Sequence, residues 1–204
     1  SAGRIIEIQD LPAEERLNQT IEQTSIGADL EHITFGYNED SIFEDTSLHI
    51  NPGEFVAIVG ESGIGKTTLI MSFLNSDSGS ISFFNSMGQT EKSTATSRHF
   101  ISYVPQGNTL FSGTIADNVR MGNRNATEEE IIAALKASSA YDFVQNLPDG
   151  MNTVIGEKGH GVSEGQAQRI SLARALVRNA PFLVLDEATA SLDEKTELRV
   201  LEGI

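Results

Sequence analysis

Hydrophobic and polar residues alternate in several short segments of the first half of the chain, a spacing that predicts β-strands. These segments are residues 30–35, 48–50 and 79–84, and residues 100–104 are also predicted to form a strand. Residues 55–59 and 182–185 are instead apolar at every position, which is typical of strands covered on both faces. The pattern therefore predicts an antiparallel portion over residues 29–60 and 79–104 beside a mostly parallel core sheet.

The second half of the chain has the spacing of helices over residues 114–179. Thr127 and Ser163 are each followed three residues later by Glu or Gln and then by an apolar stretch, which is the pattern of a capping box at a helix start. A polar helix is predicted from about Asp193. The polar segment 85–98 is predicted to be a surface loop. We expect an α/β fold with a helical subdomain at about residues 114–179.

Length and charge narrow the functional classes. The chain has 204 residues, which fits one domain, with 14 Lys and Arg against 29 Asp and Glu, a net charge of −15. Such an acidic chain is poorly suited to binding nucleic acid. It has no cysteine, which excludes a thiol nucleophile and a cysteine-bound zinc. No apolar run is long enough to span a bilayer, so we expect any membrane role to come through a partner.

A glycine-rich loop follows the apolar segment 55–59. Its sequence, GESGIGKT, fits the phosphate-binding pattern G-x-x-x-x-G-K-[ST]. The glycines let backbone N–H groups cradle phosphate, Lys66 reaches the β- and γ-phosphates, and the Thr67 hydroxyl binds Mg²⁺. The alternative is a chance glycine turn. The predicted ATP-binding residues of this loop are Gly60, Glu61, Ser62, Gly63, Ile64, Gly65, Lys66, Thr67 and Thr68.

Two adjacent acids close the apolar segment 182–185. Asp186 is predicted to hold Mg²⁺, and Glu187 to orient or deprotonate an attacking water. Taken alone, the pair is also compatible with an acidic turn at a strand end. Together with the glycine-rich loop it indicates a P-loop nucleoside triphosphatase.

Residues 162–169, VSEGQAQR, precede an apolar helix and resemble the signature motif of ATP-binding cassette (ABC) ATPases. Three other family landmarks occur in the right order. Gln106 resembles the Q-loop glutamine, Tyr37 stands where the family has an aromatic residue that stacks on adenine, and residues 190–193 resemble the D-loop. The resemblance covers residues 29–200.

The segments TVIGEKG at 153–159 and TLFSGTI at 109–115 are similar to those of ABC exporters. The resemblance implies a nucleotide-binding domain over residues 29–204 and a linker from a membrane domain over residues 1–28. It implies an ATPase that uses ATP and Mg²⁺ and powers export through ATP-driven pairing of two cassettes. Its partners would be the transporter's transmembrane domain and a second nucleotide-binding domain, at the cytoplasmic face of a membrane. The isolated chain would be soluble.

The resemblance also implies roles for single residues. Lys66, Gln106 and Glu187 would be catalytic, and Thr67, Gln106 and Asp186 would hold the metal. The signature residues that face ATP in the dimer would be Ser163, Glu164, Gly165 and Gln166, and the D-loop residues Ser191, Leu192 and Asp193. Ser163 and Gln166 are also explained by a simple capping box, Tyr37 by an ordinary strand aromatic, and Gln106 by a surface glutamine.

The sequence departs from the family in two ways. Glu164 replaces a glycine of the signature, and we expect its side chain to point away from the nucleotide. The four histidines, His32, His49, His99 and His160, all precede the acidic pair, so none is at the position of the family's switch histidine. We therefore expect this chain to lack the C-terminal part of the domain and to hydrolyse ATP slowly.

Three other functions compete with an exporter domain. A soluble, non-transport ABC ATPase of DNA repair or the ribosome is disfavoured by the net charge and by the exporter-like segment 153–159. A small-molecule kinase built on a P-loop is disfavoured by the signature. A regulatory cassette without turnover is disfavoured by Lys66 and Glu187. The sequence does not indicate the transported substrate.

Overall fold

The computed structural model describes most of the chain, and it divides into two units, residues 1–99 and residues 100–204. The described residues are 21, 25–37, 40–61, 63–72, 78–94, 97–156 and 161–204. Nearly all of the predicted linker lies outside this set. Each unit is considered by itself.

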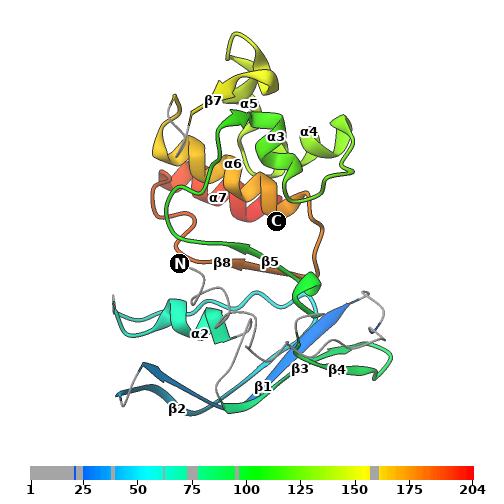
Figure 1. Cartoon of the computed structure of the whole chain (residues 1–204), viewed down its shortest axis with the longest axis vertical. Coiled ribbons are helices and arrows are strands. Elements are labelled where there is room, and N and C mark those ends of the chain that lie inside the picture. The colour runs from blue at the N-terminus through cyan, green and yellow to red at the C-terminus, as the bar shows by residue number, and fades with distance from the viewer. Residues whose placement is uncertain are drawn as a thin grey trace, which may run out of the picture. The chain divides into compact units, whose positions relative to one another are not determined.

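The first unit contains a four-stranded antiparallel sheet in the order β2-β1-β3-β4 (Figure 1). Its elements are β1 (Ile26–Tyr37), β2 (Asp40–Ile50), the helix α2 (Lys66–Ser72), β3 (Ser78–Asn85) and β4 (Thr90–Lys92). Ala28 of β1 lies opposite Ile50 of β2 and Phe83 of β3, and both Ala28 and Phe83 are fully buried. The alternating segments 30–35, 48–50 and 79–84 are thus confirmed as strands.

Two predictions for the first unit are wrong. Residues 85–98 are not simply a surface loop, because they include β4, whose Glu91 is buried. Residues 55–59 form no strand in the structure, and Phe55 and Val59 are 74% and 88% exposed. An apolar segment becomes a strand only when a neighbouring strand accepts its backbone hydrogen bonds, and no described strand pairs with this one.

The second unit contains a parallel pair of strands, β5 (Ile101–Val104) and β8 (Phe182–Leu185). Placing residues 101–104 in the antiparallel portion was therefore wrong, because β5 pairs with a strand some 80 residues later rather than with its neighbours in sequence. The helices α6 (Glu164–Leu176) and α7 (Glu194–Gly203) belong to the same unit (Figure 1). Val104, Leu172 and Val200 form a buried cluster between these elements.

The segment between β5 and α6 is mainly helical, as predicted, with one short antiparallel strand pair. Its elements are β6 (Gly113–Thr114), α3 (Ile115–Arg120), α4 (Glu128–Ala137), α5 (Tyr141–Gln145), η2 (Gly150–Asn152) and β7 (Val154–Ile155); η1 (Ser97–Phe100) lies where the two units meet in the sequence. Ile115, Ile131 and Ile170 are fully buried in one core that joins α3, α4 and α6. The capping box at Thr127 is confirmed.

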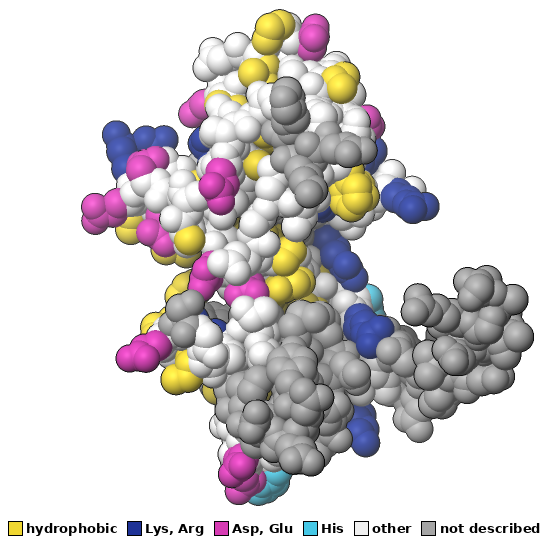
Figure 2. Space-filling view, turned by 60° about the vertical axis from the view of Figure 1, so that its left-hand side comes forward, with side chains coloured by type: hydrophobic (Ala, Val, Ile, Leu, Met, Phe, Trp, Pro, Cys, Tyr) yellow, Lys and Arg dark blue, Asp and Glu magenta, His cyan; other side chains and the backbone are white. Residues whose placement is uncertain are grey.

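The surface carries both signs of charge. On the face drawn in Figure 2, acidic side chains are scattered among basic ones. In the part of the chain that the structure describes, no helix combines the length and the apolar character needed to cross a bilayer.

Candidate functional site

The glycine-rich loop of the first unit leads directly into α2. Gly63 and Gly65 have φ angles of +83° and +101°, in the left-handed region that side chains other than glycine rarely adopt. The Ile64 N–H donates to the Glu61 carbonyl at 3.4 Å, and the Leu69 N–H donates to the Gly65 carbonyl at 2.9 Å. The loop is therefore a tight turn closed by its own backbone. Ser62 lies outside the described residues.

Lys66, the first residue of α2, folds back over this turn. Its ammonium donates to the carbonyls of Gly60 at 2.9 Å and Glu61 at 2.8 Å. Thr67 is exposed, whereas Thr68 is buried in the first unit. The arrangement places one positive charge directly at the turn, where an anion would be attracted.

The acidic pair lies in the second unit, just after β8. The Asp186 N–H donates to the Val104 carbonyl at 3.0 Å, which extends the pairing of β8 with β5 by one residue. Asp186 is only 4% exposed, and its Oδ2 accepts a hydrogen bond from the Tyr103 hydroxyl at 3.1 Å. Burial and this hydrogen bond to Asp186 raise the pKa of Tyr103 to about 12, so the hydroxyl remains a donor at neutral pH.

Glu187 adopts a strained backbone conformation with φ of +50°. Such conformations cost about 1–3 kcal/mol and are concentrated at functional sites. The Glu187 carboxylate is exposed and accepts a hydrogen bond from Gln106 Nε2 at 2.6 Å. Two predicted site residues 81 positions apart in sequence are therefore in contact.

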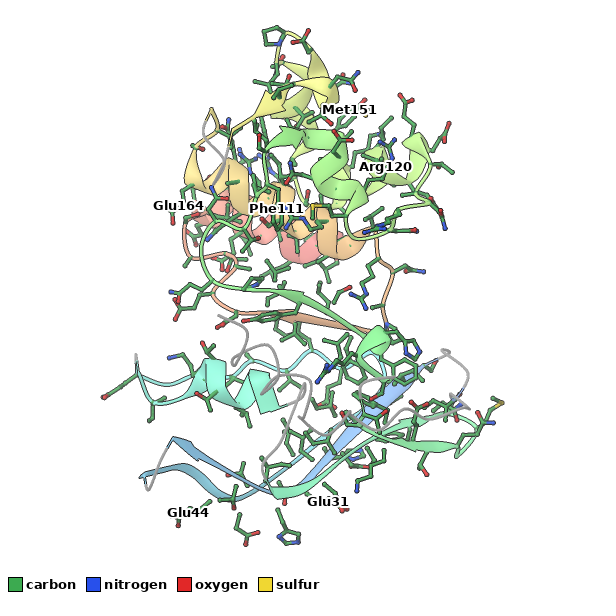
Figure 3. The ribbon with its side chains drawn as sticks, viewed as in Figure 1. Glu31, Glu44, Phe111, Arg120, Met151 and Glu164 are labelled. Atoms are coloured by element: carbon green, nitrogen blue, oxygen red, sulfur yellow. The ribbon has the colours of Figure 1, made fainter. Side chains whose placement is uncertain are left out.

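The signature segment begins α6. Ser163 is the N-cap, its Oγ accepting from the Gln166 N–H at 3.3 Å, while the Gln166 side chain accepts from the Ser163 N–H at 2.9 Å. The predicted capping box is confirmed. Glu164 is exposed in the first turn of α6 (Figure 3), where a negative charge is favoured by the helix dipole.

The D-loop residues pack against the start of α6. A Cβ placed on Gly165 would lie 3.1 Å from the Ser191 carbonyl oxygen and 3.5 Å from Leu192 Cδ2. Ser191 Oγ donates to Oε1 of the buried Gln168 at 2.6 Å. Asp193 is the N-cap of α7, and its hydrogen bonds from Thr196 lower the pKa of the Asp193 carboxyl.

A buried network that the sequence did not reveal holds the loop after Gln106. Arg174 of α6 donates to the Thr109 carbonyl at 3.0 Å and to the Asn118 carbonyl and Oδ1 at 2.9 Å each. Asn118 in turn accepts from the Phe111 N–H and donates to the Phe111 carbonyl. Figure 3 labels Phe111, whose ring centroid lies 5.6 Å from the Arg174 guanidinium carbon. Burial lowers the pKa of Arg174.

The structure groups the predicted residues by unit. The phosphate loop belongs to the first unit, and Gln106, the signature, the acidic pair and the D-loop belong to the second. Tyr37 ends β1, but its side chain lies outside the described set, as do residues 157–159 of the exporter-like segment. Tyr103, Gln168 and Arg174 were missed. The sequence did contain hints of these residues. Tyr103 has a polar hydroxyl within an apolar strand, and Gln168 and Arg174 are polar residues within an apolar helix.

This fold and these motifs define an ATP-binding cassette. The sequence model of the ABC transporter family matches residues 43–190, most of the chain, and the chain belongs to that family.

Particular members of the family are similar over nearly the whole chain. An ATP-dependent lipid A-core flippase of Syntrophus aciditrophicus is 41% identical, over all of this chain and 35% of its own. A second relative, from Staphylococcus aureus, is named as a multidrug export ATP-binding/permease protein. It is 41% identical, over 91% of this chain and 33% of its own. The structure of a bacterial Atm1-family ABC exporter with ATP bound matches with a TM-score of 0.87 at 32% identity, covering 99% of this chain and 36% of that one. The chain spans about a third of the length of these relatives.

Proposed function

We propose that this chain is the ATP-binding and ATP-hydrolysing domain of an ABC exporter. The observation that carries the proposal is the position of Lys66, whose ammonium donates to the Gly60 and Glu61 carbonyls across a turn with two left-handed glycines. A triphosphate offers stronger acceptors than these carbonyls, because its oxygens carry negative charge that attracts the Lys66 ammonium. Lys66 would therefore exchange loop carbonyls for β- and γ-phosphate oxygens.

The residues present also fit Mg²⁺. Thr67, Gln106 and Asp186 offer hydroxyl, amide and carboxylate oxygens, the hard ligands that Mg²⁺ prefers. When bound, Mg²⁺ would neutralise charge on the phosphates.

The hydrolytic step is assigned to Glu187. Its exposed carboxylate can accept a proton from water or orient it, and the 2.6 Å hydrogen bond from Gln106 fixes its direction. Tyr37 would stack on adenine, and the capped start of α6 with Ser163 would face the nucleotide of a second cassette. These roles follow from the match of the motifs with the family.

The exporter assignment is supported by the relatives, which include a flippase, a protein named for multidrug export and an Atm1-family exporter. These relatives favour a transporter over a non-transport ABC ATPase. The natural partners would be a transmembrane domain, joined through residues 1–28, and a second cassette at the cytoplasmic face of the membrane. The transported substrate would be selected by the transmembrane domain.

The proposal is tested by measuring ATP binding to the chain and to Lys66→Ala. We expect the variant to lose at least about a hundredfold in affinity, because it lacks the only side-chain cation of the phosphate motif. Lys92→Ala, which removes an exposed lysine of β4 in the same unit, is the matched control and should bind ATP like the parent. Equal affinity in Lys66→Ala and Lys92→Ala would refute the phosphate assignment.

A further inference from the structure

Tyr103 is placed beside Asp186 by the register of two strands. Tyr103 of β5 lies opposite Val184 of β8 in a parallel pair. Because side chains on a strand alternate between faces, Asp186 projects from the same face as Val184, two residues further on. The tyrosine ring spans this distance, and its hydroxyl donates to Asp186 Oδ2 at 3.1 Å.

Both partners of this hydrogen bond are held in rigid surroundings. Asp186 is 4% exposed, and its neighbour Val104 is 2% exposed. Ser102 fixes β5 from the other side, because its buried Oγ donates to the Ala175 carbonyl of α6 at 3.0 Å. A donor on so fixed a strand holds one carboxylate oxygen in a defined direction and leaves the rotation of the Asp186 side chain little freedom.

Tyrosine differs from phenylalanine only in its hydroxyl, which is the group that contacts Asp186. A buried carboxylate must be hydrogen-bonded or neutralised by a cation. The Tyr103 hydroxyl donates to Oδ2 and is one of the groups that satisfy this buried carboxylate.

We propose that Tyr103 is a positioning residue that orients the Asp186 carboxylate for the Mg²⁺ of bound nucleotide. The inference rests on the proposed function, in which Asp186 is a ligand of that ion. In this role Tyr103 acts through Asp186 alone and does not contact the nucleotide. Its loss should therefore weaken the metal-dependent part of ATP binding and leave the metal-free part unchanged.

The test compares Tyr103→Phe with Tyr141→Phe, each of which removes one hydroxyl. Tyr141 is the matched control, because its hydroxyl accepts only a hydrogen bond from Gln145 on the surface of α5 among the contacts described. ATP affinity is measured with excess Mg²⁺ and with EDTA. In Tyr103→Phe we expect the gain in affinity from Mg²⁺ to fall by about tenfold, since the hydrogen bond has a charged acceptor. Affinity in EDTA should match the parent, and Tyr141→Phe should match it in both conditions.

Asp186→Asn separates positioning from a general effect on the fold. It should abolish most of the gain from Mg²⁺, and adding Tyr103→Phe to it should cause no further loss. An unchanged Mg²⁺ gain in Tyr103→Phe, or equal losses with and without the metal, would overturn the inference while leaving the proposed function standing. If the parent binds no ATP in either condition, the proposed function fails and the inference fails with it.

Discussion

Gly63 in the first unit and Gly122 in the second both resist an added Cβ, but for opposite reasons. Gly63 has a φ of +83°, and a Cβ added to it would meet no atom within 4 Å. A Cβ on Gly122 would lie 1.9 Å from the Arg174 carbonyl oxygen and 3.0 Å from Val177 Cγ1. The phosphate loop of the first unit thus depends on backbone conformation in open space, whereas the segment after α3 in the second unit depends on close packing against α6.

The side chains follow the same division. Lys66 bonds only to loop carbonyls among the contacts described. In the second unit, by contrast, Tyr103 holds Asp186 and Gln106 holds Glu187. A site made by backbone tolerates changes in its neighbours, whereas a site made by interlocking side chains depends on each of them.

The largest effect is expected from Gly122→Ala. The new methyl group overlaps a backbone oxygen of α6, so either α3 or α6 must shift, and overpacking of this kind costs up to about 3 kcal/mol. Gly150→Ala is the control in the same unit, since Gly150 has a φ of +53° and no atom within 4 Å of an added Cβ. It should lose only about 1 kcal/mol, from backbone strain. Urea unfolding measures both, and a Gly122→Ala chain no less stable than Gly150→Ala would break the comparison.

A smaller effect is expected from Gly63→Ala. No atom is displaced, so the cost is the left-handed backbone alone, about 1 kcal/mol. Gly63→Asn should lose less than Gly63→Ala, because asparagine enters this region more readily. The same unfolding measurement applies, together with ATP affinity. If asparagine and alanine destabilise equally, the site at Gly63 is restricted by contacts rather than by φ.

This division also explains what the sequence could predict. The phosphate loop is a local motif, so the turn at residues 63–65 and the helix after it were predictable from spacing alone. The capping boxes at Thr127 and Ser163 were predictable for the same reason. The contacts of Tyr103 with Asp186 and of Arg174 with Thr109 depend on the pairing of β5 with a distant β8 and on the packing of α6, which no local pattern encodes.

The predicted strand at residues 55–59 failed because a local pattern does not show whether a distant strand is available for pairing. Its apolar composition favoured a buried strand, but a strand also needs a partner, and the structure leaves Phe55 and Val59 exposed. Glu91 is the opposite case. It lies in a polar segment that was predicted to be a surface loop, yet it is buried and its carboxylate accepts a hydrogen bond from the Ile21 N–H at 3.0 Å. Composition predicts burial only where the partners are local.

The smallest expected effect concerns pH in the first unit. The hydrogen bond with Asp29 raises the pKa of His49 above its usual value near 6.5. The stabilisation is therefore fully present below about pH 6.5 and is lost as pH rises through the raised pKa. An NMR titration of the His49 ring should show its pKa fall towards the usual value in Asp29→Asn. Asp45→Asn, which removes the partner of His32 instead, should leave the His49 titration unchanged.

We propose that this chain both binds and hydrolyses ATP, and that Glu187 acts only in hydrolysis. The most direct measurement is a single-turnover experiment that compares the parent with Glu187→Gln. The chain is in excess over ATP, and Mg²⁺ is supplied. We expect Glu187→Gln to bind ATP within about twofold of the parent's affinity and to convert it to ADP at least about a hundredfold more slowly, the scale of a lost general base. Conversion by Glu187→Gln at the parent's rate would contradict it.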